Sequence, residues 1–332
     1  MADVARSAQV ALSTVSRALG GKPGVSEEQR ARILAVAREL DYAVSPAASG
    51  LASGRTGAVG VLVPHIDRWF HSTVLAGLED GLRETGMDLL LYRAESAGER
   101  SAFFSALPFR RRVDALAVVA ISLSEAETAA LAGHGIPVIG ISCRLPGQRF
   151  VGIDDAAGAA AAVRHLTNLG HRRIAVIRTT TVTGSYGAAS AERYRGYRQA
   201  MAERGLEVPD AYVASAPWGV EGGAEAMAQL LASSRPPTAV FCESDEVAIG
   251  ALRTLRRSNL VPGRDLSVMG FDDHLMADLL DLSTVAQPVQ DQGRIGADLL
   301  LAALGRGEAD RPEVVLPTRL VVRGTTASPQ GR

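Results

Sequence analysis

The chain contains little cysteine and almost no lysine. Cys143 and Cys242 are its only two cysteines, and neither lies at metal-ligand spacing from a histidine or another cysteine. This pattern argues against a disulfide framework and against a zinc site, and it is typical of a reduced cytosolic protein. Lys22 is the only lysine among 35 basic residues, which we interpret as the codon bias of a GC-rich genome.

The sequence also lacks features that direct a chain to a membrane. No charged segment followed by an apolar one opens the chain, and no apolar run approaches the roughly 18 residues that a spanning helix needs. We therefore expect a cytoplasmic protein with no membrane partner.

Motifs of the common enzyme classes are absent. There is no Gly-x-Ser-x-Gly elbow and no P-loop, and the first apolar strand does not lead into Gly-x-Gly-x-x-Gly. His71, His134 and His165 show no metal-ligand spacing with cysteines or acids. We expect no enzyme activity, no cofactor and no metal.

The net charge of −1 is distributed unevenly along the chain. Residues 1–55 contain seven basic and five acidic side chains, so the remainder carries the negative excess. This asymmetry favours the N-terminal end as the part that faces a nucleic acid.

Residues 3–19 predict two short helices separated by a tight turn. Val15, Ala18 and Leu19 give the second helix a small apolar face, while its other face carries hydroxyls and Arg17. Such a face suits base edges and phosphates in a major groove. A third helix follows, because Ser26 and Gln29 have capping-box spacing before apolar residues at helical intervals.

A linker and an alternating α/β pattern follow the three helices. Residues 43–57 are small and rich in glycine and serine, with a short helix expected from Ser45 to Ala52. Beyond them, apolar strands alternate with helices, which predicts parallel sheets covered on both faces. Because the strands are too many for one compact sheet, we expect two lobes with a ligand crevice at the carboxyl ends of the strands.

Several motifs together resemble the lactose/galactose repressor (LacI/GalR) family of bacterial transcriptional regulators, nearly from end to end. They are Asp3-Val4-Ala5, Thr14-Val15-Ser16-Arg17, Val25-Ser26-Glu27, Leu51, Leu169-Gly170-His171, Arg193 with Gly196-Tyr197, Asp245, Gly270-Phe271-Asp272-Asp273 and Gln287-Pro288.

This resemblance implies an α/β protein with an N-terminal helix-turn-helix head and a two-lobed core like periplasmic binding proteins. The expected ranges are 1–44 for the head, 45–57 for a hinge helix or linker, and 58–332 for the effector-binding and dimerisation core. Within that core the lobes are expected at roughly 58–153 and 154–283, with the C-terminal segment crossing between them. No leucine heptads close the sequence, so we expect a homodimer on a palindromic double-stranded operator.

The resemblance also assigns DNA contacts. Leu12 and Ser13 would face bases, Thr14 and Ser16 would hold phosphates, and Arg17 would contact a base or a phosphate. Leu51 would wedge into the minor groove at the operator centre and kink the DNA.

The head departs from the family pattern at several positions. The family's turn glycine is Gln9 here, so this residue must adopt the turn at some strain. Ala11 replaces the serine or threonine that caps the recognition helix, which forfeits roughly 1 kcal/mol. The residues that start the first helix in the family are nearly absent, which leaves open an upstream start codon or a frayed helix. We expect weaker or more dimer-dependent DNA binding than in the family.

Six residues are the expected effector contacts. Arg193 presents a planar fork of donors for hydroxyls or a carboxylate, and Asp272 would accept from ligand hydroxyls. Trp218 offers a flat apolar face to a sugar ring. His65 and Phe70, with Asp67 and Trp69 beside them, would form the wall of the first lobe. Asp245 would contact the ligand, cap its helix or brace the pocket.

The favoured function is a sequence-specific DNA-binding transcriptional regulator, a repressor, whose operator affinity is controlled allosterically by a small polar effector, a sugar. A nucleoside or a small acid remains open as the effector. One alternative is a cytosolic sugar-binding protein whose degenerate head no longer binds DNA. Another is an α/β enzyme with an accessory head, which the missing catalytic motifs oppose.

Overall fold

The computed structural model describes residues 1–20, 23–42, 55–180, 187–307 and 311–330. The predicted helix from Ser45 to Ala52 and the predicted wedge residue Leu51 lie outside these ranges. The described chain divides into two compact units, one formed by Met1–Ala58 with Arg111–Asp114 and the other by Val59–Arg110 with Ala115–Arg332.

The first unit contains three helices around a small core: α1 (Ala2–Ser7), α2 (Leu12–Leu19) and α3 (Glu27–Glu39). The apolar residues Val4, Val15 and Ile33 are fully buried at its centre, so all three helices contribute to the core. Ser26 caps α3, since its hydroxyl accepts a hydrogen bond from the Gln29 amide. The three predicted helices are confirmed.

The turn between α1 and α2 carries the strain that the sequence predicts. Gln9 has φ +52°, which places a non-glycine residue in the left-handed region. Ala11 occupies the N-cap of α2 and provides no side-chain hydrogen bond there. Both features cost local stability at the start of α2, because Gln9 is strained where glycine would not be and the first amides of the helix lack a side-chain acceptor.

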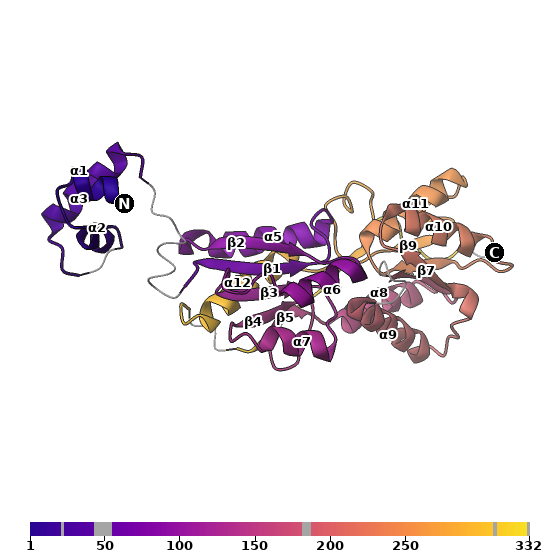
Figure 1. The fold of residues 1–332 in the computed structure, drawn as a ribbon. Coiled ribbons are helices and arrows are strands. Elements are labelled where there is room, and N and C mark those ends of the chain that lie inside the picture. The colour runs from indigo at the N-terminus through magenta and orange to yellow at the C-terminus, as the bar shows by residue number, and fades with distance from the viewer. Residues whose placement is uncertain (21–22, 43–54, 181–186, 308–310, 331–332) are drawn as a thin grey trace. The chain divides into compact units, whose positions relative to one another are not determined.

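The second unit contains two main sheets, which we use to define its lobes (Figure 1). The first lobe is a six-stranded sheet in the order β11-β5-β4-β3-β1-β2 with its helices, and the second is a four-stranded sheet in the order β7-β6-β8-β9 with its helices. Pairs β1–β3, β3–β4, β4–β5 and β5–β11 are parallel, as are all pairs of the second sheet. A third, two-stranded antiparallel sheet joins β10 and β12.

The strands are β1 (Ala58–Val63), β2 (Asp88–Arg93), β3 (Ala115–Val119), β4 (Val138–Ile141), β5 (Arg149–Ile153), β6 (Ile174–Thr180), β7 (Val213–Pro217), β8 (Ala239–Cys242), β9 (Ser267–Met269), β10 (Thr284–Ala286), β11 (Glu313–Leu316) and β12 (Arg319–Val321). The helices are α5 (Trp69–Leu82), α6 (Ala97–Ala106), α7 (Glu125–Ala132), α8 (Asp155–Asn168), α9 (Ala188–Glu203), α10 (Val220–Leu231), α11 (Asp245–Arg257) and α12 (Val289–Ala303), with 3-10 turns η1 (Arg83–Thr85) and η2 (Asp210–Tyr212).

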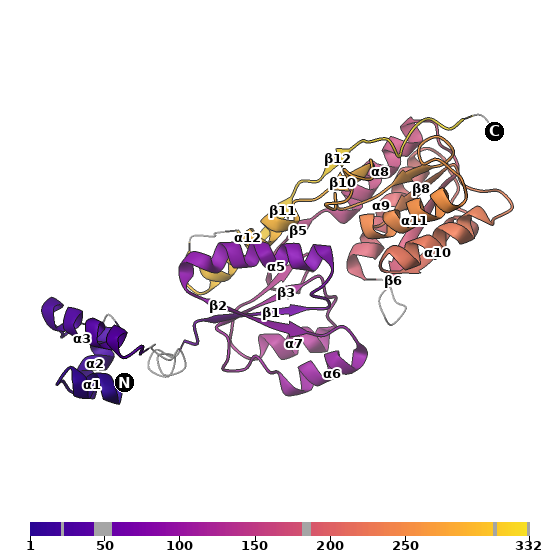
Figure 2. The same ribbon diagram turned by 90° about the horizontal axis from the view of Figure 1, so that it is seen from above.

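Helices cover both faces of each parallel sheet. In the first lobe, α5 and α12 lie on one face and α6 and α7 on the other (Figure 2). In the second lobe, α10 and α11 pack on one side and α8 and α9 on the other, with a separate apolar core on each side. This arrangement confirms the predicted α/β class with parallel sheets, because every buried strand face meets an apolar helix face.

Several elements were not predicted from the sequence. They are β5, β7, α6, α12 and the three C-terminal strands. Helix α12 was not predicted because Gly293 and Gly296 interrupt its apolar spacing. In the structure both glycines allow close packing, Gly293 against the Val74 backbone and Gly296 against the Ile141 side chain. It packs against α5 and the first-lobe sheet, so residues distant in sequence complete that lobe.

We predict that Gly77→Ala destabilises the protein by about 1–3 kcal/mol, because a new methyl group must displace backbone. A Cβ atom at Gly77 of α5 would lie 2.1 Å from the Gln290 carbonyl oxygen of α12. Denaturant unfolding measures the effect. The control is Gly98→Ala in α6, where nothing lies within 4 Å of the new atom. Equal stability of the two variants would contradict the close contact.

Candidate functional site

The first candidate surface is the exposed face of α2. Leu12, the first residue of this helix, is 52% exposed despite its apolar side chain. Val15 and Ala18 are buried against the other two helices, and the remaining predicted DNA contacts lie at solvent-accessible positions: Ser13, Ser16 and Arg17 are exposed and Thr14 is half-buried. The arrangement presents hydroxyls and one guanidinium on one side of a short helix, which is the chemistry of a base-reading surface.

The second candidate site is centred on Arg193, which lies on α9 and is only 5% exposed. Its Nε donates to Oδ1 of Asp155 at 2.8 Å, and its Nη1 lies 3.4 Å from Oδ1 of Asp272. Nη1 also donates to the Glu243 carbonyl oxygen, and the guanidinium lies 3.8 Å from the centroid of the Phe271 ring. A single fixed cation therefore holds together the ends of three separate chain segments of the second lobe.

Two buried acids of the second lobe, Asp272 and Glu243, have raised pKa values. Burial raises the pKa of Asp272 to about 8, although Arg193 beside it works in the opposite direction. Burial likewise raises the pKa of Glu243 to about 7, partly offset by the Thr179 amide, which donates to Glu243 Oε2 at 2.9 Å. Both side chains therefore hold a proton more readily than a free carboxyl group does, because burial penalises the charged form.

Asp245 braces the same region without contacting Arg193. Its Oδ1 accepts from the Thr284 hydroxyl at 2.7 Å, and its Oδ2 accepts from the His274 amide at 2.8 Å. The N-cap hydrogen bond of α11 comes from Ser244 instead. Asp245 is fully buried, and burial raises its pKa to about 6. Of the predicted roles, the observed contacts are those of a brace.

The first-lobe residues gather around a buried histidine. The rings of His65 and Phe70 lie 5.5 Å and 5.4 Å from the ring of His71. His65 also places Nδ1 3.5 Å from a Glu95 carboxylate oxygen. Burial lowers the pKa of His71 to about 3, so this ring is neutral at physiological pH. The predicted wall therefore contains an additional aromatic side chain, His71, which the sequence analysis considered only in arguing against a metal site.

Trp218 links the two lobes electrostatically. Its Nε1 donates to the Glu246 carboxylate, and the Arg68 guanidinium of the first lobe lies 5.8 Å from the centre of its ring. Nearby, the ring of Trp69 lies 5.0 Å from that of His274. These contacts place aromatic and charged groups from both lobes at one boundary.

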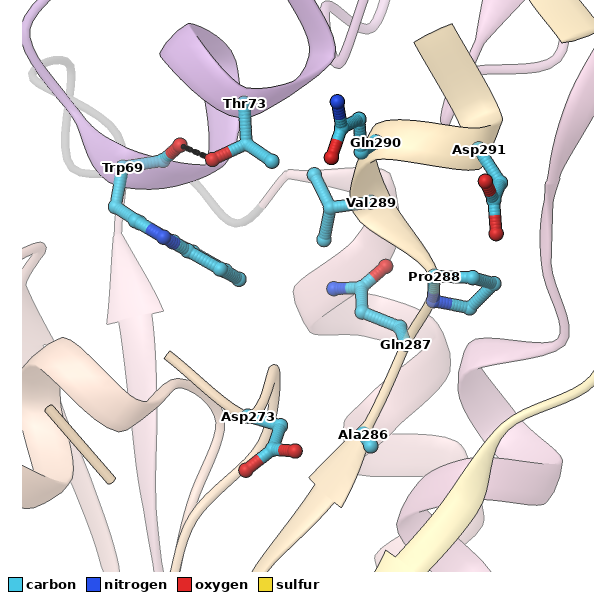
Figure 3. A pocket seen from close by; sticks show the side chains of 9 residues that line it. All are labelled: Trp69, Thr73, Asp273, Ala286, Gln287, Pro288, Val289, Gln290 and Asp291. Carbon is cyan, nitrogen blue, oxygen red and sulfur yellow. Dashed lines mark hydrogen bonds between the residues drawn. The ribbon is translucent and has the colours of Figure 1, made fainter. Parts of the chain in front are cut away.

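A hollow of about 270 Å³ opens beside this boundary. Figure 3 shows the Trp69 indole facing Gln287 and Val289 across it, with Asp273 at one end. Its other lining residues are Thr73, Ala286, Pro288, Gln290 and Asp291. None of the six predicted effector residues lines this hollow, but Gln287 connects it to Asp272 through a 2.6 Å hydrogen bond.

The structure thus joins some predicted residues and not others. Arg193 and Asp272 meet directly, and His65 and Phe70 meet through His71. Sequence reasoning missed Glu243 and Gln287. Gln287 was visible as part of a Gln-Pro motif, whereas Glu243 gave no signal beyond its place between a strand and a helix.

Neither a metal site nor a membrane-spanning helix is found within the described ranges. No group of three or more His, Cys, Asp or Glu side chains there is placed to hold a metal ion. No helix in those ranges combines the length and the apolar character needed to cross a bilayer.

The two units therefore define a helix-turn-helix head and a two-lobed, ligand-sized core. Comparison with known families agrees: residues 1–45 match the model described as bacterial regulatory proteins, lacI family, and residues 163–326 match the periplasmic binding protein-like domain.

Similar proteins cover almost the whole chain. Catabolite control protein A of Priestia megaterium is 30% identical over 98% of this chain and 98% of its own. A lac repressor dimer bound to operator and the anti-inducer ONPF is 25% identical with a TM-score of 0.84, covering 98% of both chains. A complex of the transcriptional regulator CelR with cellobiose is 28% identical with a TM-score of 0.72, covering 97% of this chain and 98% of that one.

The chain belongs to the LacI family of bacterial regulatory proteins and is a DNA-binding transcriptional regulator. The family assignment favours this function over a sugar-binding protein with a defunct head. The relatives named above are transcriptional regulators.

We predict that the stability of Glu243→Gln relative to the wild type increases with pH. A buried acid with a raised pKa stabilises the fold below its unfolded pKa of 4.5, and this contribution is lost as the pH rises through about 7. Glutamine cannot ionise, so the difference in unfolding free energy shifts in favour of the variant by on the order of 1–3 kcal/mol. Denaturant unfolding at pH 5, 7 and 8 measures it, and a pH-independent difference would contradict the buried acid.

Proposed function

We propose that this chain is a repressor that binds a palindromic operator as a homodimer. A small polar effector, a sugar, controls its affinity for the operator. In this proposal residues 1–44 read DNA, residues 45–57 form the hinge, and residues 58–332 bind the effector and dimerise. The observation that supports this proposal most directly is the buried Arg193 between Asp155 and Asp272. The guanidinium provides fixed hydrogen-bond donors, and the two carboxyl groups provide fixed acceptors.

Three features favour a neutral, hydroxyl-rich ligand. The carboxylates near Arg193 accept hydrogen bonds, the guanidinium donates them, and the aromatic rings at the lobe boundary provide apolar faces for C–H groups. An anionic ligand would meet several buried acids there. The CelR complex with cellobiose is consistent with a sugar in this type of core.

The experiment that tests the DNA-binding part is selection of genomic fragments by the purified full-length protein at low and moderate salt. Recovery of a palindrome would support the proposal, and the neighbouring genes would suggest the effector. If the protein binds all fragments equally and this binding weakens strongly with salt, the proposal is contradicted, since phosphate contacts carry no sequence information.

We predict that Arg17→Ala removes operator-specific binding while non-specific binding at low salt remains. A base contact of this kind is worth about 1–3 kcal/mol, and a dimer would lose it twice. Gel shift with the selected palindrome measures the loss. The control is Arg38→Ala, an exposed arginine on α3 outside the predicted reading helix. If Arg17→Ala retains wild-type affinity, the assignment of α2 is wrong.

We predict that Arg193→Met weakens sugar binding at least tenfold, because a charge-assisted hydrogen bond is worth roughly 1.5–3 kcal/mol. The two tryptophans of the chain, Trp69 and Trp218, both lie at the lobe boundary and serve as fluorescence reporters. Titrations use cellobiose, D-ribose and adenosine.

The matched control is Arg198→Met, an exposed arginine on the same helix, which should bind like the wild type. Unchanged binding by Arg193→Met would exclude Arg193 as an effector contact. Binding of adenosine alone would exclude a sugar as the effector.

A further inference from the structure

A chain of buried amides runs from the second-lobe carboxylate into the first lobe. Gln287 Nε2 donates to Asp272 Oδ1 at 2.6 Å, and Gln292 Nε2 donates to Gln287 Oε1 at 2.9 Å. The Ser142 hydroxyl donates to Gln292 Oε1 and completes the chain. We call Asp272, Gln287, Gln292 and Ser142 the amide relay.

Three of the four relay residues are buried, and Ser142 is half-buried. Gln292 is fully buried on α12, and Asp272 and Gln287 are 4% and 7% exposed. The neighbours of Gln292 on the same helix, Val289 and Leu299, belong to the apolar core of the first lobe. A glutamine there gains nothing from hydrophobic burial, so its hydrogen bonds must offset the cost of taking an amide out of water.

The direction of the hydrogen bonds follows from the carboxylate. Asp272 Oδ1 also faces Nη1 of Arg193 at 3.4 Å and therefore accepts, so Gln287 presents its N–H group to this oxygen and its own oxygen to Gln292. Gln292 must then present its own N–H group to Gln287 and its oxygen to the Ser142 hydroxyl. Every donor in the relay points towards Asp272, and the bonds therefore polarise one another.

The relay ends at a constrained turn. Ser142 follows β4 directly, has φ +53°, and its amide donates to the Val151 carbonyl oxygen at 2.8 Å. A change in the hydrogen bond to its side chain acts on a backbone already held in a rarely populated conformation.

We propose that Gln292 and Ser142 are positioning residues that transmit a change in the hydrogen bonding of Asp272 to the β4 turn of the first lobe. The regulatory meaning of this link rests on the proposed function, in which an effector hydroxyl competes for the Asp272 oxygen. Neither residue needs to contact the effector.

The test is amide hydrogen exchange of the full-length protein without DNA or ligand. Asp272→Asn changes the group that accepts from Gln287 Nε2, and exchange in peptides covering residues 141–149 should accelerate about three- to tenfold, the equivalent of one net hydrogen bond. In a Gln292→Leu background the same change should produce no further acceleration.

The matched control background is Gln290→Leu, since Gln290 lies on the same turn of α12 but donates to Asp80 outside the relay. There, Asp272→Asn should accelerate exchange as in the wild type. The proposal is overturned if Asp272→Asn leaves these peptides unchanged, or if Gln292→Leu does not block its effect.

Ser142→Ala interrupts the relay at a second point, because it removes the hydroxyl that donates to Gln292 Oε1. It serves if Gln292→Leu does not fold. It should block the response in the same way, and an undiminished response in it would also overturn the proposal. Because the readout needs neither operator nor sugar, a failure of the relay is distinguishable from a failure of the proposed function.

Discussion

The ion pairs of Arg193 with Asp155 and Asp272 are the interaction on which the rest of the second lobe depends. They join the start of α8, the middle of α9 and the loop after β9, all in a place from which solvent is largely excluded. Burying charges is costly, and the cost is recovered only if each charge keeps its partners. A ligand that replaces one partner of Asp272 therefore acts on the packing of three elements at once.

The first lobe depends on a different constraint, the close approach of α5 and α12. The backbones meet where Gly77 and Gly293 face each other, so no side chain separates the two helices there. The same helix α12 carries Gln292 at its buried N-terminal end. The helix that closes the first-lobe core therefore also donates a hydrogen bond, from Gln292 Nε2, to Gln287 in the crossing segment.

Local patterns in the sequence were sufficient for the head and the parallel sheets, whereas Arg193 and Asp272 were identified as candidates through the family resemblance. The apolar face of α2, the capping serine before α3 and the buried strands each follow from nearby residues. Helix α12 and residue Gln292 could not be found that way. A glutamine in an apolar helix has no local signal, because its partners Gln287 and Ser142 are set by a fold in which position 142 meets position 292. Leu51 lies outside the described residues and stays a prediction.

The energies available to the relay fit the task assigned to it. Allosteric coupling between a ligand and a distant site typically amounts to about 1–3 kcal/mol. One net hydrogen bond contributes about 0.5–1.5 kcal/mol, and bonds to a charged group contribute more. The loss or reorientation of one or two bonds in the relay therefore supplies a coupling of this size without disrupting either core. A purely apolar residue at position 292 would pack well but would leave the carboxylate of one lobe and the turn of the other without a directional link.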